Sequence, residues 1–143
     1  MIKSVSINDQ TLYNQYLNLR WSLLRKPLGG ARGTEIDIFE SESFHRAIFD
    51  HNDNITGVGR IHFIQNTAQI RYMAIIKEFR SKGLGSKLIK ELENIALENN
   101  IKKIFLNSRF KAVDFYIKNG YVKIASVKPP FGNIIHYRME KIF

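Results

Sequence analysis

The hydrophobic pattern changes its period at residues 80–86, and this change constrains the fold more than any other feature. Before it, three extended runs cover residues 45–50, 55–64 and 68–76, and turn-like segments rich in Asn and Asp or Gln separate them. After it, apolar residues recur at helical spacing along one face, namely Leu84, Leu88, Leu92, Ile95 and Ala96. The pattern predicts an antiparallel meander that leads through a glycine-containing turn into an amphipathic helix.

Shorter patterns on both sides complete the order of elements. Residues 2–7 alternate like a strand, and Asn8 or Asp9 can cap a helix on which Leu12, Tyr16, Leu19 and Leu23 share a face. The later segments are a loop at 27–33, a strand at 103–106, a helix at 112–117 and closing strands at 121–127 and 134–139. The predicted order is β-α-loop-β-β-β-α-β-α-β-β, an α/β fold with helices packed on a mixed sheet.

The composition is that of one globular domain over residues 1–143, with 44% hydrophobic and 24% charged residues. No apolar run approaches the roughly 18 residues that cross a bilayer, so no membrane association is expected. The absence of cysteine excludes disulfides and thiolate metal sites, and the four histidines show no metal-ligand spacing. Because the first ten residues lack a hydrophobic signal region, a cytoplasmic location is expected.

The net charge of +9 favours anionic ligands, which include nucleic acids, anionic membranes and polyphosphate cofactors. The basic residues are spread along the chain rather than gathered in an arm or tail. A basic nucleic-acid-binding module would need clustered Lys and Arg with exposed aromatic residues on one face. The phenylalanines occupy mostly core-like positions, so no nucleic-acid partner is expected and this module is the weaker alternative.

The turn at residues 80–86 combines several features that suit a phosphate group. It reads Arg80, Ser81, Lys82, Gly83, Leu84, Gly85 and Ser86, directly before the predicted helix. A helix N-terminus offers unpaired N–H groups, glycines let an anion approach the backbone, and the cations add charge. A P-loop and a Rossmann fingerprint both fail, because Lys87 follows Ser86 and Leu88 replaces the third glycine. A tight turn whose glycines serve only backbone geometry is the alternative.

The same turn resembles the Arg/Gln-x-x-Gly-x-Gly/Ala signature of the GNAT superfamily of acetyl-CoA-dependent N-acetyltransferases. Residues 70–75 resemble the strand before that signature, and residues 112–121 resemble the later helix, A-x-x-F-Y-x-x-x-G-F/Y. Residues 24–29 and 135–141 are similar to a bacterial subgroup of this superfamily, although Ile135 stands where that subgroup has proline. The element order matches the family fold over the whole chain.

The resemblance implies a sheet that splays at a bulge between the strands near 68–76 and 103–108, with the pantetheine arm of acetyl-CoA in the gap. Backbone groups near residues 73–75 would bind pantetheine and stabilise the oxyanion, and the turn at 80–86 would bind pyrophosphate. The implied cofactor contacts are Met73, Ala74, Ile75, Arg80, Ser81, Lys82, Gly83, Leu84, Gly85, Ser86, Asn107, Phe115 and Tyr116.

The implied reaction moves an acetyl group from acetyl-CoA to a primary amine by direct attack on the thioester. Tyr116 matches the family tyrosine that protonates the departing thiolate. His62 and His136 are the candidate general bases, and a water chain that ends at backbone or carboxylate is equally open. An acyl-CoA-binding sensor that lacks turnover is the second alternative.

The acceptor, a small-molecule or peptide amine, is expected at the loop of residues 27–38. Arg32, Glu35 and Asp37 are the candidate contacts there, and the acidic pair would suit a cationic amine; a solvated polar loop is the alternative reading. Arg20 and Trp21 on the first helix are further candidates for the same cleft. The oligomeric state is open, and a homodimer is one option.

Overall fold

The computed structural model describes all 143 residues as one seven-stranded sheet with three helices. The strand order is β1-β2-β3-β4-β5-β7-β6, and only the β4–β5 pair is parallel. The strands are β1 (Ile2–Val5), β2 (Phe44–Phe49), β3 (Ile55–Ile64), β4 (Thr67–Ile75), β5 (Lys103–Arg109), β6 (Val122–Val127) and β7 (His136–Ile142). The helices are α1 (Gln10–Leu24), α2 (Leu84–Glu98) and α3 (Val113–Lys118). The predicted α/β fold and its order of elements are confirmed.

The boundaries differ most at the closing strands. β5 runs to Arg109 and β7 starts at His136, and the two pair without interruption from Lys103↔Ile142 to Arg109↔His136. Backbone pairing with the partner strand therefore sets the ends of each strand. The hydrophobic pattern of one strand alone does not show where this pairing stops.

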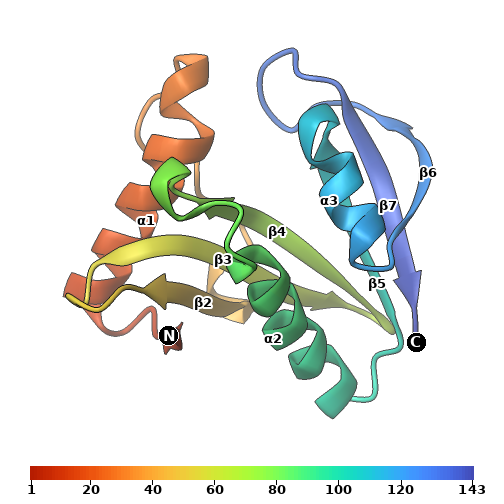
Figure 1. The fold of residues 1–143 in the computed structure, drawn as a ribbon, viewed down its shortest axis with the longest axis horizontal. Coiled ribbons are helices and arrows are strands. Elements are labelled where there is room, and N and C mark those ends of the chain that lie inside the picture. Colours follow the sequence, from red (N-terminus) through yellow and green to blue (C-terminus); the bar gives the residue numbers. More distant parts are fainter.

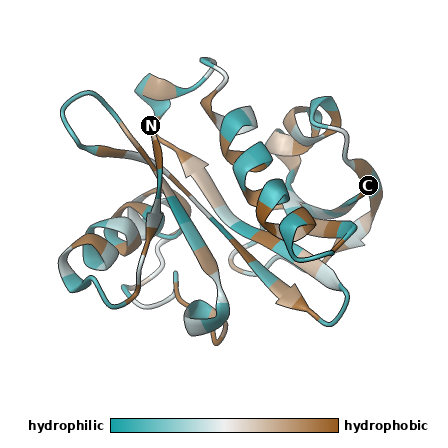
Figure 2. Cartoon of the chain, turned by 90° about the horizontal axis from the view of Figure 1, so that it is seen from below, coloured by the Kyte–Doolittle hydropathy of each residue, from teal (hydrophilic) through white to brown (hydrophobic).

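Two helices cover opposite faces of the N-terminal half of the sheet (Figure 1). The side chain of Asp9 accepts a hydrogen bond from the Leu12 N–H at 3.2 Å and so caps α1, as predicted. α2 approaches the other face closely, because a Cβ on Gly59 would lie 3.0 Å from Leu88 Cδ2. Hydrophobic residues occur along the helices and along the strands (Figure 2), and the buried ones form two clusters, one that includes α2 and one that includes α1.

The sheet opens between β4 and β5. These strands pair only at Ala68↔Ile104 and Gln69↔Phe105, and beyond that point they diverge (Figure 1). In the β3–β4 pair the register shifts so that Tyr72 and Met73 face a single residue, and Tyr72 adopts a φ of 58°. A bulge increases the local twist of a strand and turns it away from its neighbour. The predicted splay is therefore present, with a bulge in β4.

The short helix α3 lies against the C-terminal half of the sheet and ends as the sequence predicts. Gly120 has a φ of 93°, its N–H donates to the Ile117 carbonyl at 3.0 Å, and the Tyr121 N–H donates to the Tyr116 carbonyl at 3.0 Å. These bonds satisfy the last carbonyl groups of the helix. No helix of the chain combines the length and the apolar character that a membrane span requires.

Candidate active site

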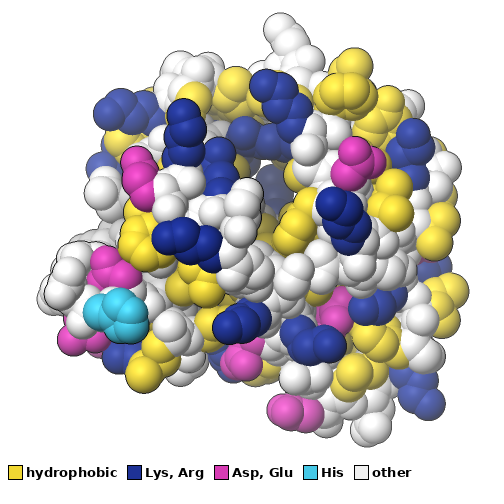
Figure 3. Space-filling view, viewed as in Figure 1, with side chains coloured by type: hydrophobic (Ala, Val, Ile, Leu, Met, Phe, Trp, Pro, Cys, Tyr) yellow, Lys and Arg dark blue, Asp and Glu magenta, His cyan; other side chains and the backbone are white.

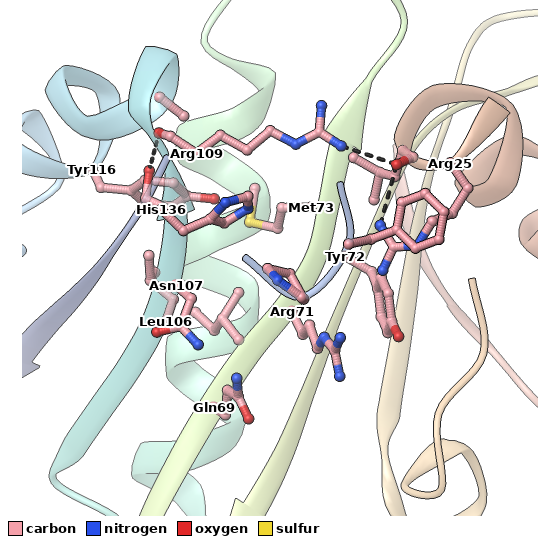
Figure 4. Close-up of a pocket in the computed structure, with 16 residues that line it drawn as sticks. Arg25, Gln69, Arg71, Tyr72, Met73, Leu106, Asn107, Arg109, Tyr116 and His136 are labelled. Atoms are coloured by element: carbon pink, nitrogen blue, oxygen red, sulfur yellow. Dashed lines mark hydrogen bonds between the residues drawn. The ribbon is translucent and has the colours of Figure 1, made fainter. Parts of the chain in front are cut away.

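A cavity of about 260 Å³ lies where β4 and β5 separate. Its walls come from both halves of the sheet, from the end of α1 and from the loop between β6 and β7 (Figure 4). The polar side chains of the lining include Arg25, Arg71, Asn107, Arg109, Tyr116 and His136. The opening of the sheet thus brings together residues that are more than a hundred positions apart in the chain.

Tyr116, on α3, is buried at the wall of this cavity with its ring edge-on to Phe115, whose centroid lies 5.1 Å away. Burial raises the pKa of Tyr116 to about 12, although the nearby Arg109 cation acts in the opposite direction. The phenol is therefore fully protonated at neutral pH and can donate a proton. Asn107, on the neighbouring strand β5, lines the same cavity.

His136, at the start of β7, presents an imidazole whose protonation state is defined by its contacts. Its Nδ1 lies 2.7 Å from the Ile134 carbonyl oxygen, which can only accept, so Nδ1 carries the proton. Burial lowers the pKa of His136, and the Arg109 and Arg25 cations lower it further against the effect of that hydrogen bond. The ring is neutral at pH 7, and Nε2 is left as a proton acceptor.

The backbone of β4 past the bulge faces the gap at alternate residues. The Ile76 N–H donates to Thr56 of β3 at 2.9 Å, so the peptide groups of Ile75 and Met73 point the other way, toward the separated β5. Arg80 Nε donates to the Ile75 carbonyl at 2.7 Å. Met73 also lines the cavity with its side chain, whereas Ala74 packs beneath α1.

The turn before α2 has the backbone form that an anion-binding loop requires. Ser81 and Gly83 have φ values of 62° and 77°, and the first helical bond runs from the Lys87 N–H to the Gly83 carbonyl at 3.2 Å. The N–H groups of the preceding three helical residues therefore lie outside the helical bond pattern. Ser81, Lys82 and Ser86 are exposed beside them, so the turn fits a pyrophosphate.

The two glycines of this turn are favoured for different structural reasons. The space around a Cβ on Gly83 is open, and its φ of 77° favours glycine. A Cβ on Gly85 would lie 2.9 Å from Phe115 Cζ, so Gly85 allows α2 to pack against α3. The sequence interpretation assigned both glycines to phosphate approach and missed this contact.

The candidate acceptor residues of the 27–38 loop do not line the cavity. Asp37 accepts hydrogen bonds from Arg60 at 2.6 and 2.9 Å and from Arg71 at 2.8 Å. The buried Glu35 carboxylate accepts from the Gly33 N–H at 2.7 Å, and the exposed Arg32 donates to Asn18 at 3.0 Å. Burial raises the pKa of Asp37, but the bonds from Arg60 and the Phe39 N–H outweigh it and hold this pKa well below its usual range.

His62 is also separate from the cavity. Its ring stacks on Phe39 at a centroid distance of 4.3 Å, and its Nδ1 accepts a hydrogen bond from Arg60 at 3.0 Å. Burial and the Arg60 charge lower the pKa of His62 to about 4. Of the two candidate bases, only His136 shares the cavity with Tyr116.

Among the residues that line the cavity, sequence reasoning missed three arginines and two aromatic residues, Tyr72 and Phe131. Arg25 and Arg71 lie inside segments that resemble the family, but their chemistry has no local signal. Tyr72 reaches the cavity through the bulge, with the guanidinium carbons of Arg20 and Arg71 at 4.2 and 4.6 Å from its ring centroid. Arg109 donates to the Leu24 carbonyl, 85 positions earlier in the chain, at 3.0 Å.

A splayed mixed sheet, a glycine turn before α2 and a cavity with a buried tyrosine define the class of acyl-CoA-dependent N-acyltransferases. Residues 33–143 match the family model of the acetyltransferase (GNAT) domain. The chain is 31% identical over 107 residues to the uncharacterised N-acetyltransferase YjcF of Bacillus subtilis, which covers 75% of this chain and 76% of that protein. The chain therefore belongs to the GNAT family of acetyltransferases.

Solved structures agree on the fold. Escherichia coli ElaA has a TM-score of 0.83 at 14% identity, over 99% of this chain and 98% of that one. An aminoglycoside 6'-N-acetyltransferase complexed with coenzyme A has a TM-score of 0.80 at 15% identity, over 99% and 96%. At these identities the likeness extends to the fold alone.

Proposed function

We propose that this protein transfers the acetyl group of acetyl-CoA to a primary amine by direct attack of the amine on the thioester. The pantetheine arm lies between β4 and β5, where Met73 and Ile75 turn their peptide groups to the gap. The pyrophosphate lies on the N–H groups of the turn at residues 80–86. Asn107 and Phe115 border the arm from β5 and α3.

The chain can perform each proton step of this reaction. His136 Nε2 takes the proton that the amine loses as nitrogen attacks the carbonyl carbon. A β4 peptide N–H near Met73 stabilises the oxyanion of the tetrahedral intermediate. When the C–S bond breaks, the Tyr116 hydroxyl gives its proton to the thiolate, and the products are the N-acetyl amine and CoA.

The observation that carries this proposal is the meeting of Tyr116 and His136 in one cavity. One is a phenol that burial keeps protonated and the other an imidazole that burial keeps neutral, so an acid and a base coexist at the same pH.

The test combines binding with turnover. CoA at saturating concentration should raise the melting temperature, because a ligand of the native state stabilises it. Release of free thiol from acetyl-CoA, measured across an amine panel, should occur in wild type and fall by about 10²–10⁴-fold in kcat in Tyr116→Phe.

Tyr137→Phe is the matched control, because Tyr137 lies on β7 and does not line the cavity. Unchanged turnover in Tyr116→Phe rejects the acid assignment. A CoA-dependent rise in melting temperature without thiol release for any amine favours the sensor alternative, and no rise at all rejects the cofactor site.

A further inference from the structure

Two arginines of the cavity wall, the buried Arg25 and the half-buried Arg109, lack a carboxylate partner. Arg25 Nη1 and Arg109 Nη2 donate to the same oxygen, the Leu24 carbonyl, at 3.1 and 3.0 Å (Figure 4). Neither residue takes part in any ion pair of the chain. Arg25 is only 5% exposed. Two guanidinium groups therefore converge on one carbonyl inside the molecule.

This arrangement is electrostatically unfavourable unless an anion joins it. Both side chains stay charged, because guanidinium groups do not lose their proton in proteins. Burial lowers the pKa of each, and for Arg25 the Arg109 charge lowers it as well. Elsewhere the same chain pairs its buried guanidinium groups, since Arg20 and Arg60 both bond the Glu40 carboxylate. An unpaired buried charge is costly, Arg25 is buried and a second cation lies beside it, so the pair marks a place for an anion.

The remaining charges of the cavity have the same sign. Arg71 contributes a third guanidinium to the wall, and its partner Asp37 is shared with Arg60. No Asp or Glu lines the cavity. Lysine and arginine side chains also gather around the hollow on the face seen in Figure 3. A cationic acceptor would meet repulsion there, contrary to the expectation from Glu35 and Asp37.

The position of the pair relates it to the reacting amine. Arg109 on β5 is paired with His136 on β7, and both line the cavity. A small molecule whose anion binds the guanidinium pair can therefore place its amine near the imidazole. The Arg25 guanidinium carbon lies 5.6 Å from the Tyr72 ring centroid and 5.1 Å from the Phe131 ring centroid. Contacts of a guanidinium with aromatic rings help to hold its planar group in place at the cavity wall.

We propose that the acceptor is a small primary amine that also bears an oxyanion, a carboxylate or a phosphate, which Arg25 and Arg109 bind. This inference rests on the acetyl transfer proposed above. A forked guanidinium binds either oxyanion through paired hydrogen bonds. Polycationic amines, which include polyamines and aminoglycosides, are disfavoured by the same charges.

The first experiment compares acceptors that differ only in the anion. Thiol release from acetyl-CoA is measured for α-amino acids against their carboxamides, for ethanolamine phosphate against ethanolamine, and for spermidine. At least one anionic amine should exceed its neutral counterpart about tenfold or more in kcat/KM. Which pair does so distinguishes a carboxylate from a phosphate. Faster transfer to the neutral amines or to spermidine overturns the inference but leaves the proposed function intact.

Variants then assign the effect to the pair. Arg109→Gln should raise the KM of the anionic amine, lower its kcat/KM about 10- to 100-fold and leave the KM of acetyl-CoA unchanged. Arg109→Lys, which keeps the charge, should retain part of the preference. Arg46→Gln is the control, because Arg46 pairs with Glu91 away from the cavity. A rise in the KM of acetyl-CoA instead would assign the pair to the cofactor and overturn the inference.

A binding measurement keeps the inference testable without turnover. Inorganic phosphate, added to CoA-saturated protein at constant ionic strength, should raise the melting temperature of wild type and of Arg46→Gln but not of Arg109→Gln. No rise in wild type overturns the anion site. If CoA itself does not bind while the Arg109-dependent phosphate effect persists, the acetyl-transfer proposal fails and the anion site stands.

Discussion

Glu40 is the carboxylate that pairs with both fully buried arginines, Arg20 of α1 and Arg60 of β3. It accepts hydrogen bonds from Arg20 Nη1 at 2.9 and 3.0 Å, from Arg60 Nη1 at 2.7 Å and from the Tyr13 hydroxyl at 3.0 Å. Arg20 and Arg60 are both 0% exposed. Arg60 has a second carboxylate in Asp37, whereas Arg20 has none. Loss of the Glu40 charge therefore leaves Arg20 as a buried cation without an anion.

We expect Glu40→Gln to lower the free energy of unfolding by about 3–5 kcal/mol, the usual effect of removing one partner of a buried ion pair. Domains of this kind are stable by only about 5–15 kcal/mol, so the loss is a large fraction of the total. For a chain of this length it corresponds to a fall in melting temperature of about 6–20 °C.

Urea unfolding followed by circular dichroism provides the measurement. Glu42→Gln is the matched control, because Glu42 lies two positions away, is exposed and makes no ion pair, so its effect should stay within about 0.5 kcal/mol. The loss of unfolding free energy in Asp37→Asn should lie between those of the other two variants, since Arg60 retains its ion pair with Glu40. A loss below about 1 kcal/mol for Glu40→Gln, or one equal to that of Glu42→Gln, refutes the reasoning.

Three further perturbations test other parts of the structure. Gly85→Ala should cost about 1–3 kcal/mol through overlap with the Phe115 ring, and Phe115→Leu in the same chain should recover part of it in thermal unfolding. Burial lowers the pKa of His62 to about 4 in the folded protein, whereas the unfolded residue gains a proton below about pH 6.5. The free energy of unfolding should therefore decrease by about 3 kcal/mol as the pH is lowered from 6.5 to 4. His62→Gln should remove that part of the pH dependence in urea titrations, and an unaltered slope contradicts it. An NMR titration should give His136 a pKa below 6.5, and a midpoint above 6.5 is inconsistent with the buried neutral imidazole.

The fold follows from the sequence where apolar residues recur along a segment that turn-like residues delimit. The meander and α2 were predicted with boundaries within one or two residues, because each buries a regular apolar set. α1 is a helix as predicted, and its predicted face packs on the core through Tyr16, Leu12 and Leu19. Leu12, Leu19 and Leu23 stay partly exposed, while Arg20 lies fully buried beside Tyr16. Hydropathy cannot anticipate a buried cation, because the carboxylate that permits it arrives from residue 40.

The residues of the candidate site likewise include some that local motifs predict and some that only the fold brings together. Tyr116 and His136 were predicted from local motifs, and the structure places both at one cavity; their catalytic roles stay predictions. His62 was an equal candidate for the base, and only the fold separates it, because its ring stacks on Phe39 and bonds Arg60 and does not line the cavity. Arg25 and Arg109 could not be paired from sequence, since their common partner, the Leu24 carbonyl, lies at the end of α1 next to Arg25 but 85 positions before Arg109.

The net charge of +9 predicts only that the protein favours anionic ligands. The structure divides the arginines into those that pair with a carboxylate of the chain and those that do not. Arg20 and Arg60 are neutralised by Glu40 and Asp37, which is the arrangement expected of cations that serve stability. Arg25 is buried and Arg109 half-buried, yet the partner that they share is only a carbonyl oxygen. A chain that supplies carboxylates to the buried pair and none to the pair at the cavity wall leaves the second pair for a charge from outside, which is the property that a binding site for an anionic amine requires.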